Sequence, residues 1–151
     1  METLKIKFIK AHSFLFKIML GLIGITSCKQ AALYGTPHAD FIVKGNIQSK
    51  AENKPIAQIQ VLMSSDSLFR RKDSINSDDK GNYHVRWSEF PVSQKFYLRF
   101  IDKDGMSNGG EFKTKDTAIL FKDPKFIGGD GDWYSGKTEQ TLDIKLTNKT
   151  N

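Results

Sequence analysis

From Asp40 onward, apolar residues recur at every second position in a series of short runs. In the first run, Phe41, Val43 and Ile47 alternate with polar residues. This period of two is typical of strands with one buried face, and no stretch after Cys28 shows the period of a helix. The other alternating runs are 59–63, 83–87, 96–100, 117–121 and 142–146, with a loop or edge strand over 64–73.

Turn signals separate these runs. Residues 78–82, with the sequence Asp-Asp-Lys-Gly-Asn, predict a tight turn in which Gly81 adopts positive φ. Gly45 falls on the buried phase of the first run, which indicates a bulge or the close approach of another backbone. About seven short strands in residues 40–148 are enough for one two-sheet core, so the sequence predicts an all-β fold, a single antiparallel β-sandwich.

Residues 1–27 have the three parts of a secretory signal: a basic start, an apolar stretch at 18–25 and small residues before a cleavage point. A permanent transmembrane helix needs about 20 apolar residues, so we expect a signal helix that is cleaved. Its removal leaves 19 basic and 16 acidic residues and lowers the net charge from +6 to +3. A surplus this small argues against nucleic acid as a partner.

Cys28 is the only cysteine, and the string Ile25-Thr26-Ser27-Cys28 resembles the lipobox of bacterial lipoproteins. The resemblance implies diacylglycerol on the thiol and an acyl chain such as palmitate on the new N-terminus, which would hold the protein on its membrane. Residues 28–39 would form the lipidated tether. Lys29, where an aspartate would imply retention at the inner membrane, favours the outer membrane. The alternative is an unused thiol in a plain signal peptide or anchor.

A second resemblance covers residues 41–87. Lys44-Gly45, Lys54-Pro55-Ile56-Ala57 and the stretch from Ser77 to Tyr83 are similar to carboxypeptidase-regulatory-like domains, although Gln58 stands where a glycine is common. That similarity implies a transthyretin-like sandwich of Greek-key topology, used as an accessory binding or spacer module.

Residues 34–41, 102–105, 108–112 and 128–136 resemble a narrower group, the lipoproteins associated with radical-SAM proteins in Gram-negative bacteria. The resemblance implies a radical-SAM enzyme as a functional partner and brings no activity with it. The chain itself lacks the cysteine triplet that would hold an iron-sulfur cluster.

Two acidic, glycine-containing loops offer oxygen ligands at alternating positions, as a hard cation such as Ca²⁺ requires. A calcium site becomes plausible if the fold brings both loops to one end. The alternative is a pair of turns in which the carboxylates accept backbone N–H groups. The candidate ligands are Asp102, Asp104, Asn108, Asp130 and Asp132.

Trp133 and Tyr134 lie between glycines and form a candidate surface for a protein or glycan partner, because aromatic rings are large, rigid and amphipathic. The alternative is that they attach a long loop to the edge of the sandwich. Replacing both residues would separate a loss of binding from a loss of stability.

Few residues after Cys28 could support catalysis. The histidines there are His38 and His84, and the sequence contains no His-Glu-x-x-His, Gly-x-Ser-x-Gly or phosphate-loop motif. We therefore expect a non-enzymatic binding or scaffolding module of the cell envelope, linked to a radical-SAM system. One alternative is a substrate or accessory that a radical-SAM enzyme modifies. Another is a hydrolase based on carboxylates such as Asp102 or Asp132.

Overall fold

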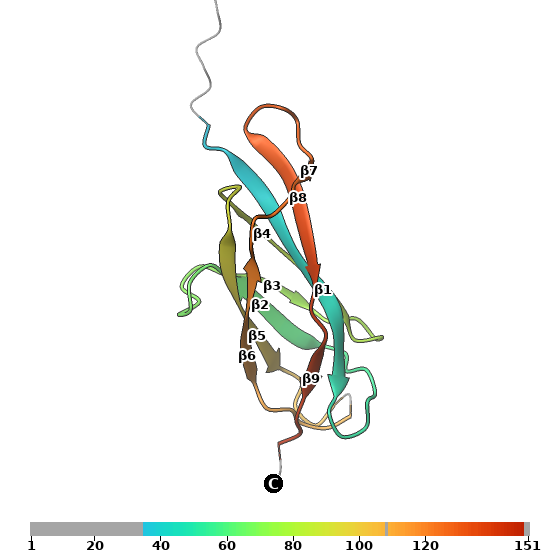
Figure 1. The fold of residues 1–151 in the computed structure, drawn as a ribbon. Coiled ribbons are helices and arrows are strands. Elements are labelled where there is room, and N and C mark those ends of the chain that lie inside the picture. The colour runs from blue at the N-terminus through green and yellow to red at the C-terminus, as the bar shows by residue number, and fades with distance from the viewer. Residues whose placement is uncertain (1–34, 108, 150–151) are drawn as a thin grey trace, which may run out of the picture. The chain divides into compact units, whose positions relative to one another are not determined.

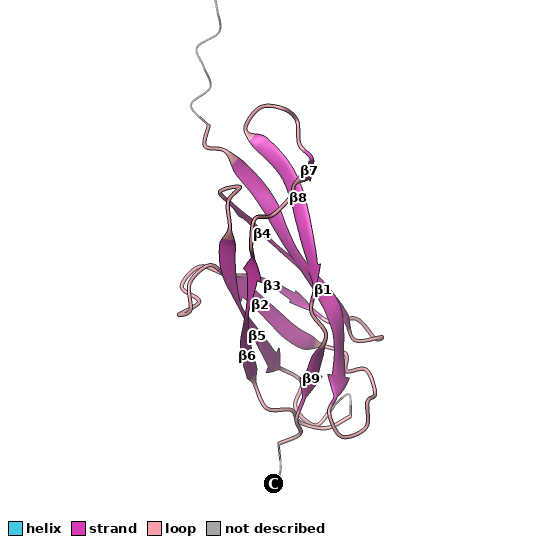
Figure 2. Ribbon diagram, viewed as in Figure 1, coloured by secondary structure: helices cyan, strands magenta, loops and turns pink. Residues whose placement is uncertain are grey.

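The computed structural model describes residues 35–107 and 109–149. The predicted signal peptide, Cys28 and Asn108 lie outside the described residues, as does most of the tether. Within them the chain forms nine strands and no helix, which confirms the all-β prediction (Figures 1 and 2). The strands are β1 (His38–Ser49), β2 (Ile59–Ser64), β3 (Asp73–Asn76), β4 (Asn82–Glu89), β5 (Gln94–Asp102), β6 (Lys115–Phe121), β7 (Ile127–Gly128), β8 (Tyr134–Thr141) and β9 (Ile144–Leu146).

The strands form two sheets, as a sandwich requires. One sheet has the order β4-β1-β8-β7, with β9 also paired to β1, and the other has the order β3-β2-β5-β6. Pairing is antiparallel throughout the second sheet, but β8 and β9 both run parallel to β1. The first sheet is therefore mixed, whereas we predicted antiparallel pairing. Alternation of apolar and polar residues has the same period in parallel and antiparallel ladders, so it did not reveal the strand direction.

The core lies between the sheets and is rich in aromatic rings. The Phe41 ring of β1 lies 5.0 Å from the Phe96 ring, 5.2 Å from Phe121 and 5.5 Å from Phe126, measured between centroids. Each ring contact of this kind adds stability beyond the burial of apolar area. The alternating residues of β1, β4 and β5 point into this core, as predicted from their period.

Gly45 lies where β1 changes partner from β8 to β9. A Cβ atom at this position would lie 2.1 Å from the carbonyl oxygen of Leu142, so only glycine lets the two backbones approach this closely. The predicted close approach is confirmed. Leu142 itself lies in the connection between β8 and β9, and the last strand begins at Ile144 instead of residue 142.

The predicted turn before β4 is also confirmed. The Asp78 carboxylate accepts the backbone N–H of Lys80 at 2.9 Å and that of Asn82 at 2.7 Å. Gly81 has a φ of 73° and donates its N–H to the Asp78 carbonyl at 2.8 Å. His84, two residues into β4, lies on the exposed face as expected.

Candidate contact surface and the two ends of the sandwich

β1 runs between two ends of the sandwich (Figure 1). We call the end at its first residue the entry end and the end at its last residue the far end. At the entry end, His38 donates its backbone N–H to the Trp133 carbonyl at 2.8 Å, and Ala39 pairs with Glu89. At the far end, Phe112 pairs with Asn148. The entry end carries the loops 90–93, 122–126 and 129–133, and the far end carries the loops 50–58 and 103–114.

The loop that carries Trp133 has a shape set by one carboxylate and several glycines. Asp130 accepts the backbone N–H of Asp132 at 2.9 Å and that of Tyr134 at 3.2 Å. Gly136 has a φ of 104°, and a Cβ there would lie 2.3 Å from the carbonyl oxygen of Ile127. These short-range bonds and close approaches define the shape of the loop.

Tyr134 is held by the start of β1. Its hydroxyl donates to the Asp40 carboxylate at 3.1 Å, and its ring lies 5.4 Å from the His38 ring. Arg86 approaches the same Asp40 oxygen at 3.6 Å. Desolvation, followed by the hydrogen bond to Asp40, raises the pKa of the Tyr134 hydroxyl. Tyr134 thus has the contacts that the alternative prediction, an attachment of the loop, requires.

Trp133 is more exposed, with 38% of its surface open to solvent. Three other large apolar side chains at the entry end are exposed as well: Phe90 by 51%, Val92 by 56% and Ile127 by 67%. We call these four residues the apolar entry patch. A hydrogen bond of 2.8 Å from the Asp123 N–H to the Ser93 hydroxyl ties loop 90–93 to loop 122–126.

Sequence reasoning missed three members of this patch. Phe90 and Val92 flank Pro91 in a connection between strands, a place where polar residues are usual, and that departure is a signal that could have been used. Ile127 lies in the two-residue strand β7, too short for alternation to reveal it.

The structure does not bring the predicted calcium ligands together. Asp102 ends β5 at the far end, whereas Asp130 and Asp132 lie in the entry-end loop. The twelve residues of β1 separate the ends by about 40 Å. Asn108 lies outside the described residues. Within residues 35–107 and 109–149 no group of three or more His, Cys, Asp or Glu side chains could hold a metal ion.

The Asp102 carboxylate has a different use in the fold. One oxygen accepts the backbone N–H of Asp104 at 3.2 Å and that of Gly105 at 3.0 Å, and the other accepts the N–H of Phe112 at 2.8 Å. The carboxylate thereby closes the far-end loop. Asp102 and Asp130 both bond backbone N–H groups, which is the arrangement of the alternative prediction. The two carboxylates named for a hydrolase, Asp102 and Asp132, lie at opposite ends.

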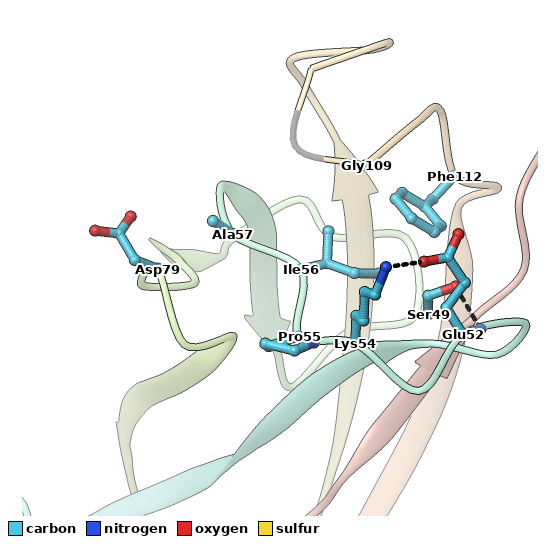
Figure 3. Close-up of a pocket in the computed structure, with 9 residues that line it drawn as sticks. All are labelled: Ser49, Glu52, Lys54, Pro55, Ile56, Ala57, Asp79, Gly109 and Phe112. Carbon is cyan, nitrogen blue, oxygen red and sulfur yellow. Dashed lines mark hydrogen bonds and ion pairs between the residues drawn. The ribbon is translucent and has the colours of Figure 1, made fainter.

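An open hollow of about 280 Å³ lies at the far end, and the sequence analysis did not predict it (Figure 3). Its lining includes the buried side chains of Ile56 and Phe112. The Lys54 ammonium points to the Glu52 carboxylate at 2.8 Å, and this hydrogen bond and its charge lower the pKa of Glu52. Both charged groups already have a partner in each other. The complete lining is Ser49, Glu52, Lys54, Pro55, Ile56, Ala57, Asp79, Gly109 and Phe112.

No helix in the described part of the chain is long and apolar enough to span a membrane.

Neither a protein-family model nor a curated protein sequence matches the chain. Among solved structures, it is similar to chlorocatechol 1,2-dioxygenase from Pseudomonas putida, with 16% identity over 76% of this chain and 68% of that one and a TM-score of 0.46. Catechol 1,2-dioxygenase from Acinetobacter sp. ADP1 gives 16% identity, 91% and 70% coverage and a TM-score of 0.48. The major pilin subunit BcpA of Bacillus cereus gives 12% identity, 74% and 31% coverage and a TM-score of 0.45. These are distant similarities between β-sandwich domains, and they assign the chain to no family.

Proposed function

We propose that the chain is an envelope lipoprotein, held at the outer membrane by lipid on Cys28, whose sandwich is a non-enzymatic contact module. The observation that carries this proposal is the apolar entry patch, which lies at the same end of the sandwich as the start of β1. The chain therefore presents four exposed large apolar side chains at the end that the tether enters.

The construction of the Trp133 loop supports a role in contact. Asp130 and the glycines hold the loop in place, and the Tyr134 hydroxyl attaches it to Asp40 at 3.1 Å. A preformed surface loses little conformational entropy when it binds, so the same contacts give a higher affinity. Of these two aromatic residues, Trp133 is the one whose exposed ring would contact a partner, and Tyr134 is the one that positions the loop.

The resemblance to carboxypeptidase-regulatory-like modules and to radical-SAM-associated lipoproteins belongs to the same proposal. It gives the module a radical-SAM system as its functional context. An alternative is that the chain is itself modified by such an enzyme. The intact mass of protein purified from native membranes separates the two, because a mass explained by the lipid alone contradicts the modification.

The same mass measurement tests the anchor. We expect a mature chain that begins at Cys28 and carries the mass of diacylglycerol plus an acyl chain. The Cys28→Ser variant should keep residues 1–27 and lack the lipid mass. An unlipidated wild-type chain would overturn the lipoprotein proposal, whatever the patch contacts.

Site-specific photo-crosslinking in native membranes tests the contact surface. A photoreactive phenylalanine analogue at Val92 samples the entry patch, and the same analogue at Met106, which is 76% exposed in the far-end loop between β5 and β6, is the matched control. We expect adducts from Val92 and few from Met106. Equal yields at the two positions would contradict a contact surface at the entry end.

A further inference from the structure

We propose that the apolar entry patch docks on the lipid bilayer itself, so that the sandwich stands on the membrane with its far end directed away. This inference rests on the proposed lipidation of Cys28 and names the occupant of the contact surface. It assigns Phe90, Val92, Ile127 and Trp133 to the headgroup and upper acyl region of the bilayer.

The length of the tether is the first argument. Nine residues lie between Cys28 and His38, and the ten Cα–Cα steps that join the two span at most roughly 36 Å when fully extended. β1 has twelve residues and is itself about 40 Å long. A lipid on Cys28 would thus keep the entry end close to the bilayer. The effective concentration of the bilayer surface at that end would be high, so even a weak contact between the two would form in a large fraction of the molecules.

The composition of the patch is the second argument. Trp133 combines a large apolar ring with an N–H group, and such rings prefer the interface between hydrocarbon and water. Phe90, Val92 and Ile127 add purely apolar exposed surface at the same end of the sandwich. Water-exposed apolar side chains gathered at one end of a small domain mark a contact site, and the bilayer is the apolar phase that the tether brings nearest.

The contrast with the far end is the third argument. There, the exposed side chains include the ion pairs Glu52 with Lys54 and Glu111 with Lys149, which prefer water. Met106 is the one large apolar side chain found strongly exposed in the described part of the far-end loops. Charged side chains occur at the entry end as well, so the ends differ in the number of large apolar side chains that they expose, and this difference has the sense that an upright orientation on a membrane requires.

The charges around the patch indicate which bilayer it fits. Asp130 and Asp132 lie beside Trp133, while Lys122 and Lys125 are exposed on the neighbouring loop. With Asp123 included, the charges of these two loops nearly cancel, so the two loops offer no basic patch to anionic lipids. Arg70 and Arg71 lie in a hollow with Glu89, the residue before Phe90, and Arg70 is already paired with Asp66. We expect docking on zwitterionic bilayers without a requirement for anionic lipid.

Tryptophan fluorescence tests the proposal directly. The described residues contain one buried tryptophan, Trp87, and one exposed tryptophan, Trp133. The mature lipoprotein is reconstituted into phosphatidylcholine vesicles that contain phospholipids brominated along the acyl chain. We expect a quenched component in the wild-type emission and its loss in Trp133→Phe, which retains only Trp87. Phosphatidylglycerol at one third of the lipid should not increase the quenching.

A reporter at the far end is the matched control. Met106→Trp in the Trp133→Phe background places a tryptophan on an exposed far-end position, and we expect no quenching there. Phe90→Ser with Ile127→Ser should reduce the quenching of Trp133 several-fold, whereas Met106→Ser, in the exposed far-end loop, should leave it unchanged. Thermal midpoints measured alongside identify any variant that fails to fold.

The outcomes separate this proposal from the one on which it rests. Flotation of the protein with the vesicles reports the lipid anchor, and quenching reports the docking. If the protein floats but Trp133 is unquenched, docking is overturned, the anchor stands, and the patch remains free for a protein or glycan. Equal quenching of Trp133 and of the tryptophan introduced at position 106 would also overturn the upright orientation. A wild-type protein that does not float contradicts the lipoprotein proposal itself.

Discussion

The entry end and the far end of the sandwich use the same local device but present different surfaces. In each, an aspartate carboxylate accepts backbone N–H groups and shapes a glycine-containing loop: Asp130 at the entry end and Asp102 at the far end. Both ends carry ion pairs, but the entry end exposes Trp133 and three other large apolar side chains, whereas the far-end loops expose one, Met106, in their described part. The acidic residues therefore account for loop shape, and the apolar side chains account for the difference between the ends.

The largest expected effect concerns Gly45, where β1 changes partner from β8 to β9. Gly45→Ala would place a methyl group 2.1 Å from the Leu142 carbonyl oxygen. Because that atom is backbone, the connection from β8 to β9 would have to move, and we expect a loss of about 3 kcal/mol in the free energy of unfolding, measured in urea. Hydrogen exchange should show lost protection in β8 and β9, on both sides of residue 45.

Gly105→Ala is the control for this substitution. Gly105 has a φ of +64°, but a Cβ there would meet no atom within 4 Å. Only the left-handed backbone opposes the methyl group, so we expect a loss of about 1 kcal/mol. Equal losses at positions 45 and 105 would contradict the close approach at Gly45.

Gly45 also shows what sequence alone can predict. Its place on the buried phase of an alternating run indicated the close approach, and the Asp-Asp-Lys-Gly-Asn string indicated the turn before β4, since both signals are local. β8 was missed because its sequence is polar almost throughout and only Gly136 is buried. Its strand conformation comes from parallel pairing with β1, which is distant in the sequence.

Of the four residues of the apolar entry patch, the sequence predicted only Trp133, for a related reason. The glycines around Trp133 marked a loop that displays an aromatic ring. Phe90 and Val92 carry no such mark, because apolar residues are usually buried and sequence does not reveal which of them a fold leaves exposed. The distance between the two acidic loops depends on strand order, and alternation contains no information on order.

The second prediction compares the two loop-shaping carboxylates. Asp102→Ala leaves the half-buried N–H of Phe112 without its partner, and we expect a loss of about 2 kcal/mol in the free energy of unfolding. Asp130→Ala frees N–H groups that water can reach, so its loss should be about 1 kcal/mol or less. Urea unfolding of both variants measures the difference.

Calcium provides the control for this comparison. If the carboxylates act on the backbone, millimolar Ca²⁺ should leave the thermal midpoint of the wild-type chain unchanged. A saturable rise in the midpoint that Asp102→Ala or Asp130→Ala abolishes would restore the metal hypothesis for that loop.

The third prediction separates the two aromatic residues of the entry end. Tyr134→Ala removes the hydrogen bond to Asp40 and the ring contact with His38, so it should lower the thermal midpoint by a few degrees. Trp133→Ala should lower the midpoint by less and reduce the bilayer contact more. The reverse order would assign the attachment of the loop to Trp133 and leave Tyr134 as the contact residue.

The smallest effects are pH dependences, and they should have opposite signs at the two ends. The pKa of Glu52 at the far end is lowered from 4.5 by its hydrogen bond to Lys54 and by the charge of Lys54. The stabilisation by the Glu52–Lys54 pair is therefore present above pH 4.5 and is lost as the pH falls through the lowered pKa of Glu52. The pKa of Tyr134 at the entry end is raised from 10.0, mainly by desolvation. Its contribution is present below pH 10.0 and is lost as the pH rises through the raised pKa.

Thermal midpoints measured across the acid and alkaline ranges test this opposition. Glu52→Gln should reduce the slope of only the acid limb, and Tyr134→Phe that of only the alkaline limb. Part of the acid limb should persist in Glu52→Gln, because the pKa values of four other carboxyl groups are also lowered, those of Asp66, Asp78, Asp116 and Glu139. Tyr83 also has a raised pKa, because burial disfavours its phenolate, so some alkaline loss should persist in Tyr134→Phe and disappear only with Tyr83→Phe added. Because the Glu52 pair is exposed, its acid effect should shrink in high salt, whereas the alkaline effect, which comes mainly from desolvation, should not. Salt sensitivity of both limbs would mean that the entry end, like the far end, is governed by surface charge, and the difference between the ends would then lie in their apolar side chains alone.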